Sequence, residues 1–144
     1  MFSISSKYAI KAVLYLALYS DEDHKIMAKD ISKSINVPQA YLAKLLQELS
    51  RRNIISSTRG PKGGFYLSDA DRNQSLIAIV DVIDGVDKLK TCLLSIKNCN
   101  EKRPCPLHGL MAPSRLVFLN GLENKTLGEL SADIKAGRSY LPFA

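Results

Sequence analysis

The first fifty residues place their apolar side chains with the period of an α-helix. In residues 6–20 these side chains recur every three or four positions, and Ser5 or Ser6 is available as the N-cap. Residues 27–34 repeat the pattern over about two turns. Asn36 follows, and because asparagine tolerates the left-handed conformation, it is typical of the end of a helix.

A third helix is predicted from Pro38 to about Arg52. Proline suits the first turn of a helix, and leucines fall on one stripe at positions i, i+3, i+4 and i+7. Two short helices joined by three or four residues indicate a helix-turn-helix, although many helical hairpins share this pattern. The leucines of the stripe are Leu42, Leu45, Leu46 and Leu49.

The next segment strengthens that interpretation. Residues 54–57 and 65–67 have the composition of two strands, separated by a turn that contains three glycines and one proline. Arg59 and Lys62 place two cations on this turn. A β-hairpin with a basic tip directly after a helix-turn-helix is a wing, so we predict a mainly α fold with a small β-hairpin wing.

Three further helical segments follow the wing. Residues 75–84 form an apolar face, and residues 126–135 begin with a capping-box sequence. Residues 110–122 are apolar again, but Pro113 is expected to break or kink this helix, or to start its second half. Residues 88–108 contain all three cysteines and two prolines, and we expect a loop-rich segment there.

The positive charge of the chain is concentrated on the predicted helix-turn-helix and wing. The 144 residues carry a net charge of +6, and residues 44–62 contain five Lys or Arg against one acidic residue. A basic patch of this kind favours a polyanionic partner, although a solvated helix face is the simpler alternative.

The exposed face of the predicted recognition helix suits DNA. Glutamine can bond adenine bidentately, an alanine methyl can touch the thymine methyl, and lysine or arginine can contact phosphates. An arginine on a glycine-rich turn, such as Arg59, can enter a narrow minor groove, or it can serve solubility alone. The candidate DNA-binding residues are Gln39, Ala40, Tyr41, Ala43, Lys44, Gln47, Arg51, Arg59 and Lys62.

The cysteines form a candidate metal site. Cys92, Cys99, Cys105 and His108 follow the spacing C-x6-C-x5-C-x2-H. Thiolates are soft anionic donors that suit iron–sulfur clusters and zinc, and the cations around them would lower the thiol pKa values. The spacing matches neither paired C-x2-C zinc motifs nor a redox C-x-x-C, so incidental cysteines remain an alternative at this stage.

The chain resembles the Rrf2 family of bacterial winged-helix regulators, which includes IscR, NsrR, RirA and CymR types. The resemblance covers nearly the whole chain and rests on residues 6–10, 37–42, 57–67 and 126–130. The wing string is quite specific to the family, and the three-cysteine pattern is specific to its iron–sulfur branch.

This resemblance implies a homodimer, held by a long helix near residues 106–122, that binds double-stranded DNA at a pseudo-palindromic operator and acts as a repressor. It divides the chain into a winged helix-turn-helix domain (1–86), a cluster loop (87–108), and a dimerisation helix with a C-terminal helix (109–144). IscR-like members bind a [2Fe–2S] cluster through three cysteines and a histidine. That pattern maps onto Cys92, Cys99, Cys105 and His108.

Two comparisons within the family shape the expectation. NsrR-like members use an acidic ligand from the first helix, and no Asp or Glu occurs here before Asp21, which favours His108 as the fourth ligand. CymR-like members give the alternative of a DNA-binding regulator without a cluster, controlled by a protein partner, thiol oxidation or zinc.

Other classes of protein are disfavoured. Prolines flank Cys105 on both sides, and neither a Gly-rich phosphate loop nor paired carboxylates accompany it, so we expect no enzyme. The apolar run at residues 9–19 contains Lys11 and is too short to span a bilayer. An odd number of cysteines and the absence of an export signal predict a reduced, cytoplasmic protein, and the resemblance implies that the organism is a bacterium.

Overall fold

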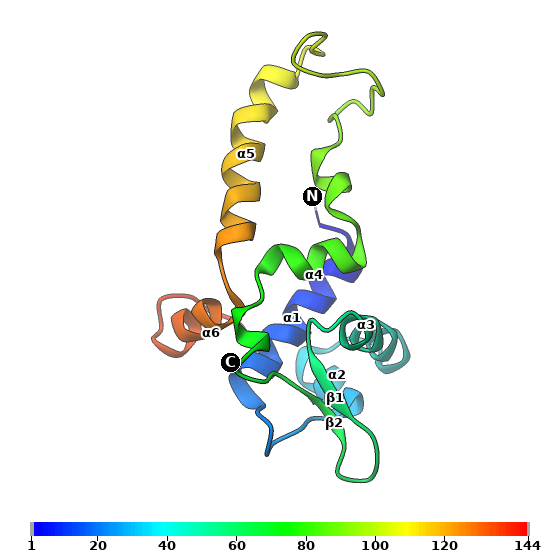
Figure 1. Cartoon of the computed structure of the whole chain (residues 1–144), viewed down its shortest axis with the longest axis vertical. Coiled ribbons are helices and arrows are strands. Elements are labelled where there is room, and N and C mark those ends of the chain that lie inside the picture. Colours follow the sequence, from blue (N-terminus) through cyan, green and yellow to red (C-terminus); the bar gives the residue numbers. More distant parts are fainter. Residues whose placement is uncertain (1, 144) are drawn as a thin grey trace.

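The computed structural model describes residues 2–143 and contains six α-helices, one two-stranded sheet and two short 3₁₀ helices in that range. The predicted class, mainly α with a small β-hairpin wing, is confirmed. Figure 1 shows α5 and the loop before it extending away from the other elements. The bounds are α1 (Ile4–Tyr19), α2 (Ala28–Ile35), α3 (Gln39–Arg51), β1 (Ser56–Thr58), β2 (Gly64–Tyr66), η1 (Asp71–Asn73), α4 (Leu76–Ile83), η2 (Val86–Lys90), α5 (His108–Asn124) and α6 (Leu127–Lys135).

Helix α1 lies at the centre of the core and begins earlier than predicted. Its N-cap is Ser3, whose hydroxyl accepts the Ser6 N–H at 3.0 Å, so the predicted caps Ser5 and Ser6 are wrong. Ser6 lies inside the helix, fully buried, and donates to the carboxylate of Asp84 at 2.7 Å. The polar start of α1 is therefore fixed against the end of α4.

Helices α2 and α3 form the predicted helix-turn-helix. Asn36 ends α2 with φ 57°, in the left-handed conformation expected for it. Leu42, Leu46 and Leu49 of α3 are fully buried in the core that α1 and α4 share, while Leu45 is half-buried. The leucine stripe therefore faces inward and leaves the opposite face of α3 to solvent.

The wing begins two residues later than predicted. Ile54 and Ile55 are buried in the core, so β1 starts at Ser56 and pairs antiparallel with β2. Phe65 exchanges backbone hydrogen bonds with Ile26 at 2.8 and 2.9 Å, which attaches the wing to the segment before α2. Gly64 has φ +149°, and a Cβ there would lie 2.8 Å from the Ile26 backbone, so this close approach requires glycine.

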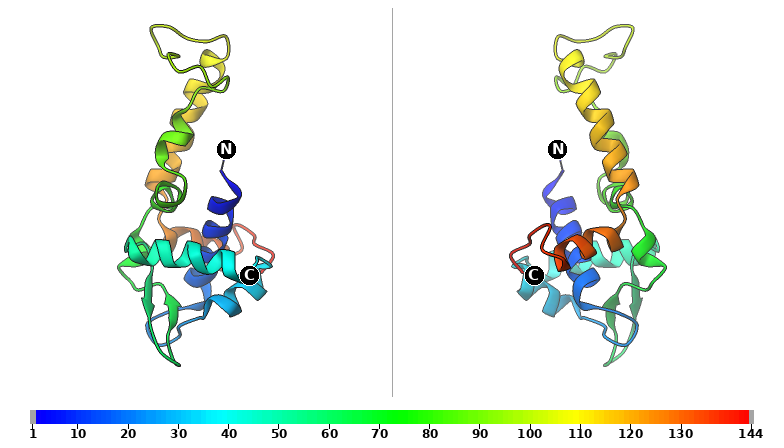
Figure 2. Two further views of the ribbon diagram at one scale, coloured as in Figure 1. Left: turned by 90° about the vertical axis from the view of Figure 1, so that its right-hand side faces the viewer. Right: turned by 90° about the vertical axis from the view of Figure 1, so that its left-hand side faces the viewer.

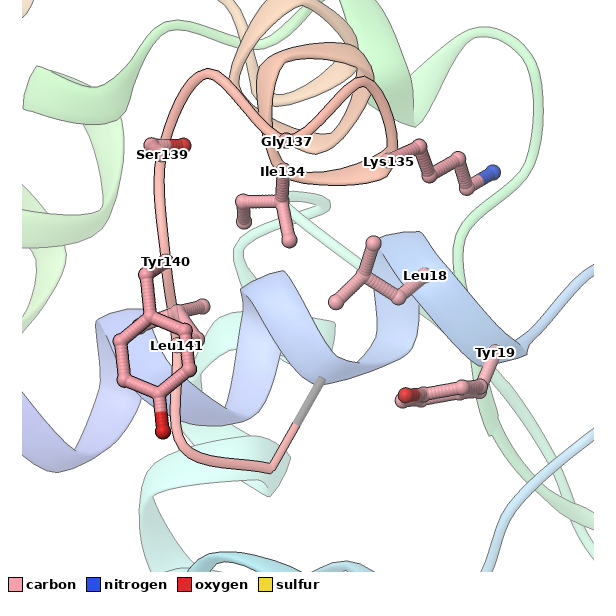
Figure 3. Close-up of a pocket in the computed structure, with 8 residues that line it drawn as sticks. All are labelled: Leu18, Tyr19, Ile134, Lys135, Gly137, Ser139, Tyr140 and Leu141. Carbon is pink, nitrogen blue, oxygen red and sulfur yellow. The ribbon is translucent and has the colours of Figure 1, made fainter.

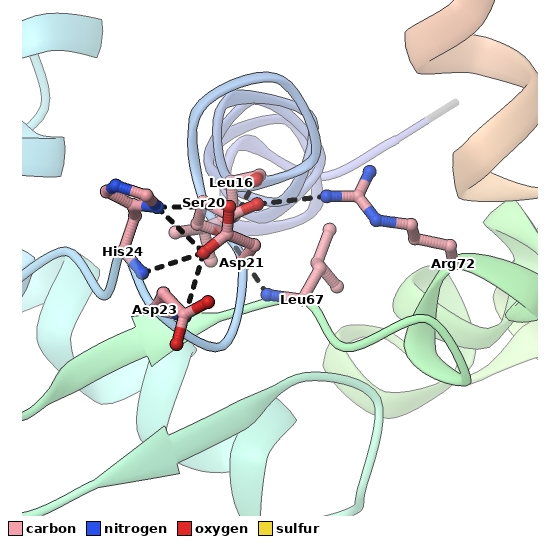
Figure 4. Close-up of polar contacts among 7 residues, drawn as sticks. All are labelled: Leu16, Ser20, Asp21, Asp23, His24, Leu67 and Arg72. Carbon is pink, nitrogen blue, oxygen red and sulfur yellow. Dashed lines mark hydrogen bonds and ion pairs between the residues drawn. The ribbon is translucent and has the colours of Figure 1, made fainter.

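A polar anchor at the end of α1 fixes the strand that leaves the wing (Figure 4). The Ser20 hydroxyl accepts the Leu67 N–H at 3.1 Å and donates to the Leu16 carbonyl. The Arg72 guanidinium donates to the carbonyls of Ala17 and Ser20 at 2.8 and 2.9 Å, which satisfies the C-terminal end of the helix. Wing and helix α1 are thereby held in one orientation.

Helix α5 continues through Pro113, so the predicted interruption is wrong. Proline in the second turn removes one hydrogen bond, to the carbonyl of Gly109, and both residues are exposed to solvent. At its far end, Leu122 packs with Val80 of α4 and Leu89 of η2 in a second apolar cluster. This cluster joins α5 to the winged helix.

Helix α6 returns the chain to the core. The predicted capping box is confirmed, because Thr126 Oγ1 accepts the Glu129 N–H and a Glu129 carboxylate oxygen accepts the Thr126 N–H, both at 3.1 Å. Leu127 is fully buried in the same cluster as α1, so α6 packs on the winged helix. The proposed division into three parts remains a prediction.

The C-terminal residues follow α6 back along α1, and the Tyr19 hydroxyl donates to the Phe143 carbonyl at 3.1 Å. They border an open, largely apolar pocket of about 430 Å³ (Figure 3), lined by Leu18, Tyr19, Ile134, Lys135, Gly137, Ser139, Tyr140 and Leu141. Over residues 2–143, none of the helices has the length and apolar character needed to cross a membrane.

Candidate nucleic-acid interface and cysteine site

The outer face of α3 and the turn of the wing carry the predicted DNA-binding residues. The structure leaves eight of the nine exposed to solvent, and the small side chain of Ala43 is half-buried. The exposed eight are Gln39, Ala40, Tyr41, Lys44, Gln47 and Arg51 on α3, with Arg59 and Lys62 on the wing.

A concavity joins the two elements. It lies between α3 and the hairpin and is bordered by Gln47, Arg51 and Arg59. Within it the hydroxyls of Ser50 and Ser57 form a hydrogen bond of 2.7 Å, which links the recognition helix directly to β1. Sequence reasoning missed these two serines. The sequence feature that could have identified Ser50 is its position one helical turn from Gln47, on the exposed side of the helix.

Two of the predicted residues already have partners within the chain. Arg51 forms an ion pair with Glu48, one turn earlier on α3. The Tyr41 hydroxyl is hydrogen-bonded to Ser5, and its ring meets Tyr8 edge to face with centroids 5.8 Å apart. Tyr41 therefore fastens the start of α3 to the start of α1, in addition to any contact it makes with DNA.

The three cysteines converge although they are separated by six and five residues. The sulfur atoms of Cys92, Cys99 and Cys105 all lie within 4.8 Å of one another. Cys92 Sγ is 3.5 Å from Cys105 Sγ, and the Cys105 N–H donates to Cys99 Sγ at 3.3 Å. The loop that carries them lies at the opposite end of the molecule from the wing (Figures 1 and 2).

His108 is the first residue of α5 and lies beside Cys99. Its Nδ1 is 3.4 Å from Cys99 Sγ, and its N–H donates to the Cys105 carbonyl at 3.0 Å. The N-terminal end of α5 therefore adjoins the sulfur atoms, where the partial positive charge of the helix favours thiolates. The structure therefore brings the three sulfur atoms together and places His108 against one of them, that of Cys99, in the wall of the same small cavity.

The thiols of Cys92 and Cys99 differ in acidity. The backbone N–H groups of Ile96 and Leu94 lower the pKa of the Cys92 thiol to about 7, so a large fraction is thiolate at neutral pH. The Cys105 N–H favours the Cys99 thiolate, but burial and the neighbouring thiols outweigh it and raise the pKa of Cys99.

Helix α5 contributes two further residues to the wall of this site. Met111 and Arg115 line the same small cavity as the three cysteines and His108. Sequence reasoning missed Arg115. Its signal is a spacing of seven residues from His108, which places both side chains on one face of a helix.

The donor set fits a soft metal centre. Three thiols and one imidazole surround a small cavity, and no carboxylate belongs to the group among residues 2–143. Sulfur and imidazole donors suit zinc or an iron–sulfur cluster rather than magnesium or calcium, which prefer oxygen. Arg115 adds a positive charge, which suits a group that is anionic when thiolates bind it.

Comparisons with known proteins identify the family of the chain. The sequence model of the Rrf2 family, described as an iron-dependent transcriptional regulator, matches residues 2–133. The HTH-type transcriptional regulator IscR of Klebsiella pneumoniae is 33% identical over 126 residues, which is 86% of this chain and 75% of the relative.

Two solved structures share the fold. CymR of B. subtilis, titled the global cysteine regulator of that organism, aligns with a TM-score of 0.72 and 21% identity over 92% of this chain and 96% of its own. IscR of T. potens aligns with a TM-score of 0.72 and 19% identity over 99% of this chain and 94% of its own.

The family match spans most of the chain, and the winged helix-turn-helix is the element by which such regulators bind DNA. Proteins of this family are regulators of transcription, so the prediction that the chain is not an enzyme is confirmed. The chain belongs to the Rrf2 family of winged-helix transcriptional regulators.

Proposed function

We propose that this chain is a cytoplasmic, homodimeric repressor whose affinity for its operator is set by an iron–sulfur cluster. The observation that carries the proposal is the convergence of Cys92, Cys99 and Cys105 within 4.8 Å, with the imidazole of His108 3.4 Å from the Cys99 sulfur. Such a group reports cluster supply, redox state or nitric oxide.

The DNA side of the proposal follows from α3 and the wing. The exposed face of α3 enters the major groove, where Gln47 and Ala40 contact base edges and Lys44 contacts a phosphate. Arg59 at the wing turn enters the adjacent minor groove. The bond between Ser50 and Ser57 keeps the two elements at a fixed separation during docking.

The cluster side assigns four ligands. Cys92, Cys99, Cys105 and His108 would hold a [2Fe–2S] cluster, which supplies one-electron chemistry and lability toward oxidants and nitric oxide when bound. The Cys92 thiol is readily deprotonated at neutral pH, as a ligand must be, because its pKa is about 7. His108 connects the site to α5, since it is both a ligand and the first residue of the helix.

The dimer is proposed from the uncovered side of α5. Leu110 and Val117, seven residues apart on one stripe, are 75% and 74% exposed, and Leu116 beside them is 61% exposed. A second copy of this helix would bury these side chains. Two recognition helices must then lie about 34–36 Å apart to read adjacent half-sites.

Coupling between the two sites follows the packing. Ligation would order the loop up to His108 and fix the start of α5, whose other end packs on α4 through Leu122 and Val80. Helix α4 contacts α1 and α3 in turn. A change at the loop can therefore alter the separation of two recognition helices in a dimer, which changes affinity without any contact to DNA.

Anaerobic purification tests the cluster proposal. We expect a coloured protein with iron and acid-labile sulfide, and a His108→Ala variant that loses its cluster faster while its circular dichroism spectrum is unchanged. A wild-type protein that remains colourless and iron-free after reconstitution would refute it. For DNA, Arg59→Ala should weaken operator binding strongly, whereas Lys135→Ala on α6 should not.

A second candidate rests on the distance between Cys92 and Cys105. Their sulfur atoms are 3.5 Å apart, so hydrogen peroxide could take two electrons and both thiol protons, leaving an S–S bond and two molecules of water. The chain would then be a thiol-based regulator of the CymR type. Mass spectrometry of peroxide-treated, iron-free protein distinguishes the candidates, because a Cys92–Cys105 disulfide that alters DNA binding supports this one.

A further inference from the structure

Arg115 occupies an unusual place for a positive charge. It lies on the same face of α5 as His108 and Met111, and it lines the small cavity that the three cysteines surround. Arg103 borders a separate open pocket beside Cys105, and Lys97 is exposed and borders none of these pockets, whereas Arg115 is the one Lys or Arg among the described residues that lines the cavity shared by the three cysteines. Arg115 is therefore positioned to act on whatever the thiols bind.

The guanidinium also holds the chain that leads to the first cysteine. It donates to the Lys90 carbonyl at 3.2 Å and to the Thr91 carbonyl at 2.6 Å, immediately before Cys92. These bonds cross from α5 to the other end of the loop. Arg115 thus closes the loop at its base and fixes the position from which Cys92 extends.

One donor of Arg115 lacks a partner. Its Nε is buried and forms no hydrogen bond to any described residue, and no carboxylate between residues 2 and 143 forms an ion pair with the side chain. A buried charged donor without an acceptor is energetically unfavourable. An anionic group in the adjoining cavity would remove that cost.

We propose that Arg115 is a positioning residue for the metal site: it orients Cys92 and offsets the negative charge of a thiolate-bound cluster. This rests on the proposed function, because it requires the anionic cluster. A reduced cluster carries one more negative charge than an oxidised one, so a nearby guanidinium stabilises the reduced form more. Arg115 therefore raises the reduction potential and slows loss of the cluster.

The test compares four anaerobically reconstituted proteins: wild type, Arg115→Met, Arg115→Lys, and Lys97→Met as a control that removes an exposed cation of the same loop. The readouts are the midpoint potential in a redox titration and the rate at which a ferrous chelator removes iron. Circular dichroism and thermal unfolding check that each variant is folded. If Arg115→Met does not fold, the comparison of Arg115→Lys with wild type still tests the role of the guanidinium.

We expect Arg115→Met to lower the midpoint potential and to speed iron loss about 10–100-fold. Arg115→Lys should keep most of the potential but lose iron faster, because an ammonium cannot bridge both carbonyls in the same way. Lys97→Met should change neither readout appreciably. Equal potentials and rates in Arg115→Met and wild type would overturn this assignment alone. A wild type that binds no cluster would overturn both this and the proposed function.

Discussion

The winged helix and the cysteine loop are built on different principles. Residues in the winged helix pack around one apolar core, in which Leu16, Leu42 and Leu46 are fully buried. In residues 91–107 only the three cysteines and Leu107 are even half-buried, and every other side chain is exposed. The winged helix is therefore stabilised by its own buried apolar core, whereas the loop buries little apart from its three cysteine side chains.

Backbone turns account for the shape of the loop. The Cys92 carbonyl accepts the Ser95 N–H at 2.9 Å, and the Cys105 carbonyl accepts the His108 N–H at 3.0 Å. Two cysteines therefore sit at the start of tight turns that direct their sulfurs to a common point. A region with few buried apolar groups has low local stability, so its order depends on what the sulfurs bind.

The largest expected effect separates the two regions by stability. Leu46→Ala should lower the free energy of unfolding by about 2–5 kcal/mol, because it empties a fully buried site. Ile96→Ala in the loop should change it by less than about 0.5 kcal/mol, because that side chain is 47% exposed. Urea denaturation of the iron-free protein measures both changes. Comparable losses of unfolding free energy in the two variants would contradict the distinction between the two regions.

A smaller effect tests the polar contact between α1 and the end of α4. Burial alone would raise the pKa of Asp84, but hydrogen bonds from Ser3 and Ser6 lower it below its ordinary value of 3.8. A lowered pKa in the folded state stabilises the protein above the unfolded value, and this stability is lost as the pH falls through the folded value. Asp84→Ala should therefore cost about 1–3 kcal/mol at neutral pH.

Repeating the comparison of wild type and Asp84→Ala at several pH values provides the control for this prediction. The difference between wild type and Asp84→Ala in urea denaturation should shrink as the pH falls from 3.8 through the lower pKa of the folded carboxylate, because the unfolded chain takes up the proton first. A difference that persists undiminished at low pH would mean that the carboxylate charge contributes nothing.

Both regions are basic, and salt dependence distinguishes them. Lys44→Ala on α3 should reduce the slope of log affinity against log salt concentration by about one, because one phosphate contact is lost. Lys97→Ala in the loop should leave the slope unchanged, since the loop lies at the far end of the molecule from the wing (Figure 2). Fluorescence anisotropy with operator DNA at several salt concentrations provides the measurement.

The smallest effect lies within the loop of the iron-free protein. Alkylation of Cys92 by iodoacetamide should rise with pH through a midpoint of about 7. Cys99 should react only at higher pH, because its pKa is raised above the ordinary 9.0. Peptide mass spectrometry resolves the two sites, and identical pH profiles would contradict the assigned hydrogen bonds to Cys92.

The two regions also differ in what the sequence could predict. Periodicity located α3 and its leucine stripe because burial imposes a period of 3.6 on a helix. It misplaced the start of β1, because Ile54 and Ile55 have strand composition but fill the core instead. Pro113 was expected to interrupt α5, yet near a helix start a missing N–H costs one bond and the helix continues.

For the cysteine site, the sequence could predict which residues take part but not how they are arranged in space. Residue type and spacing nominated Cys92, Cys99, Cys105 and His108, but no pattern in residues 91–107 encodes their convergence, which turns and the base of α5 bring about. Arg115 was missed because its spacing from His108 places both side chains on one helix face but does not show that the cysteine loop packs against that face. Its role depends on the loop that folds back against it.

Amide hydrogen exchange with and without the cluster tests the central claim most directly, namely that the core folds the winged helix and the metal site orders the loop. In anaerobically reconstituted protein, amides of residues 91–107 should gain protection relative to the iron-free protein, while those of α1 and α3 should exchange equally slowly in both. A loop that is equally protected without the cluster, or an α3 that loses protection with it, would contradict this account.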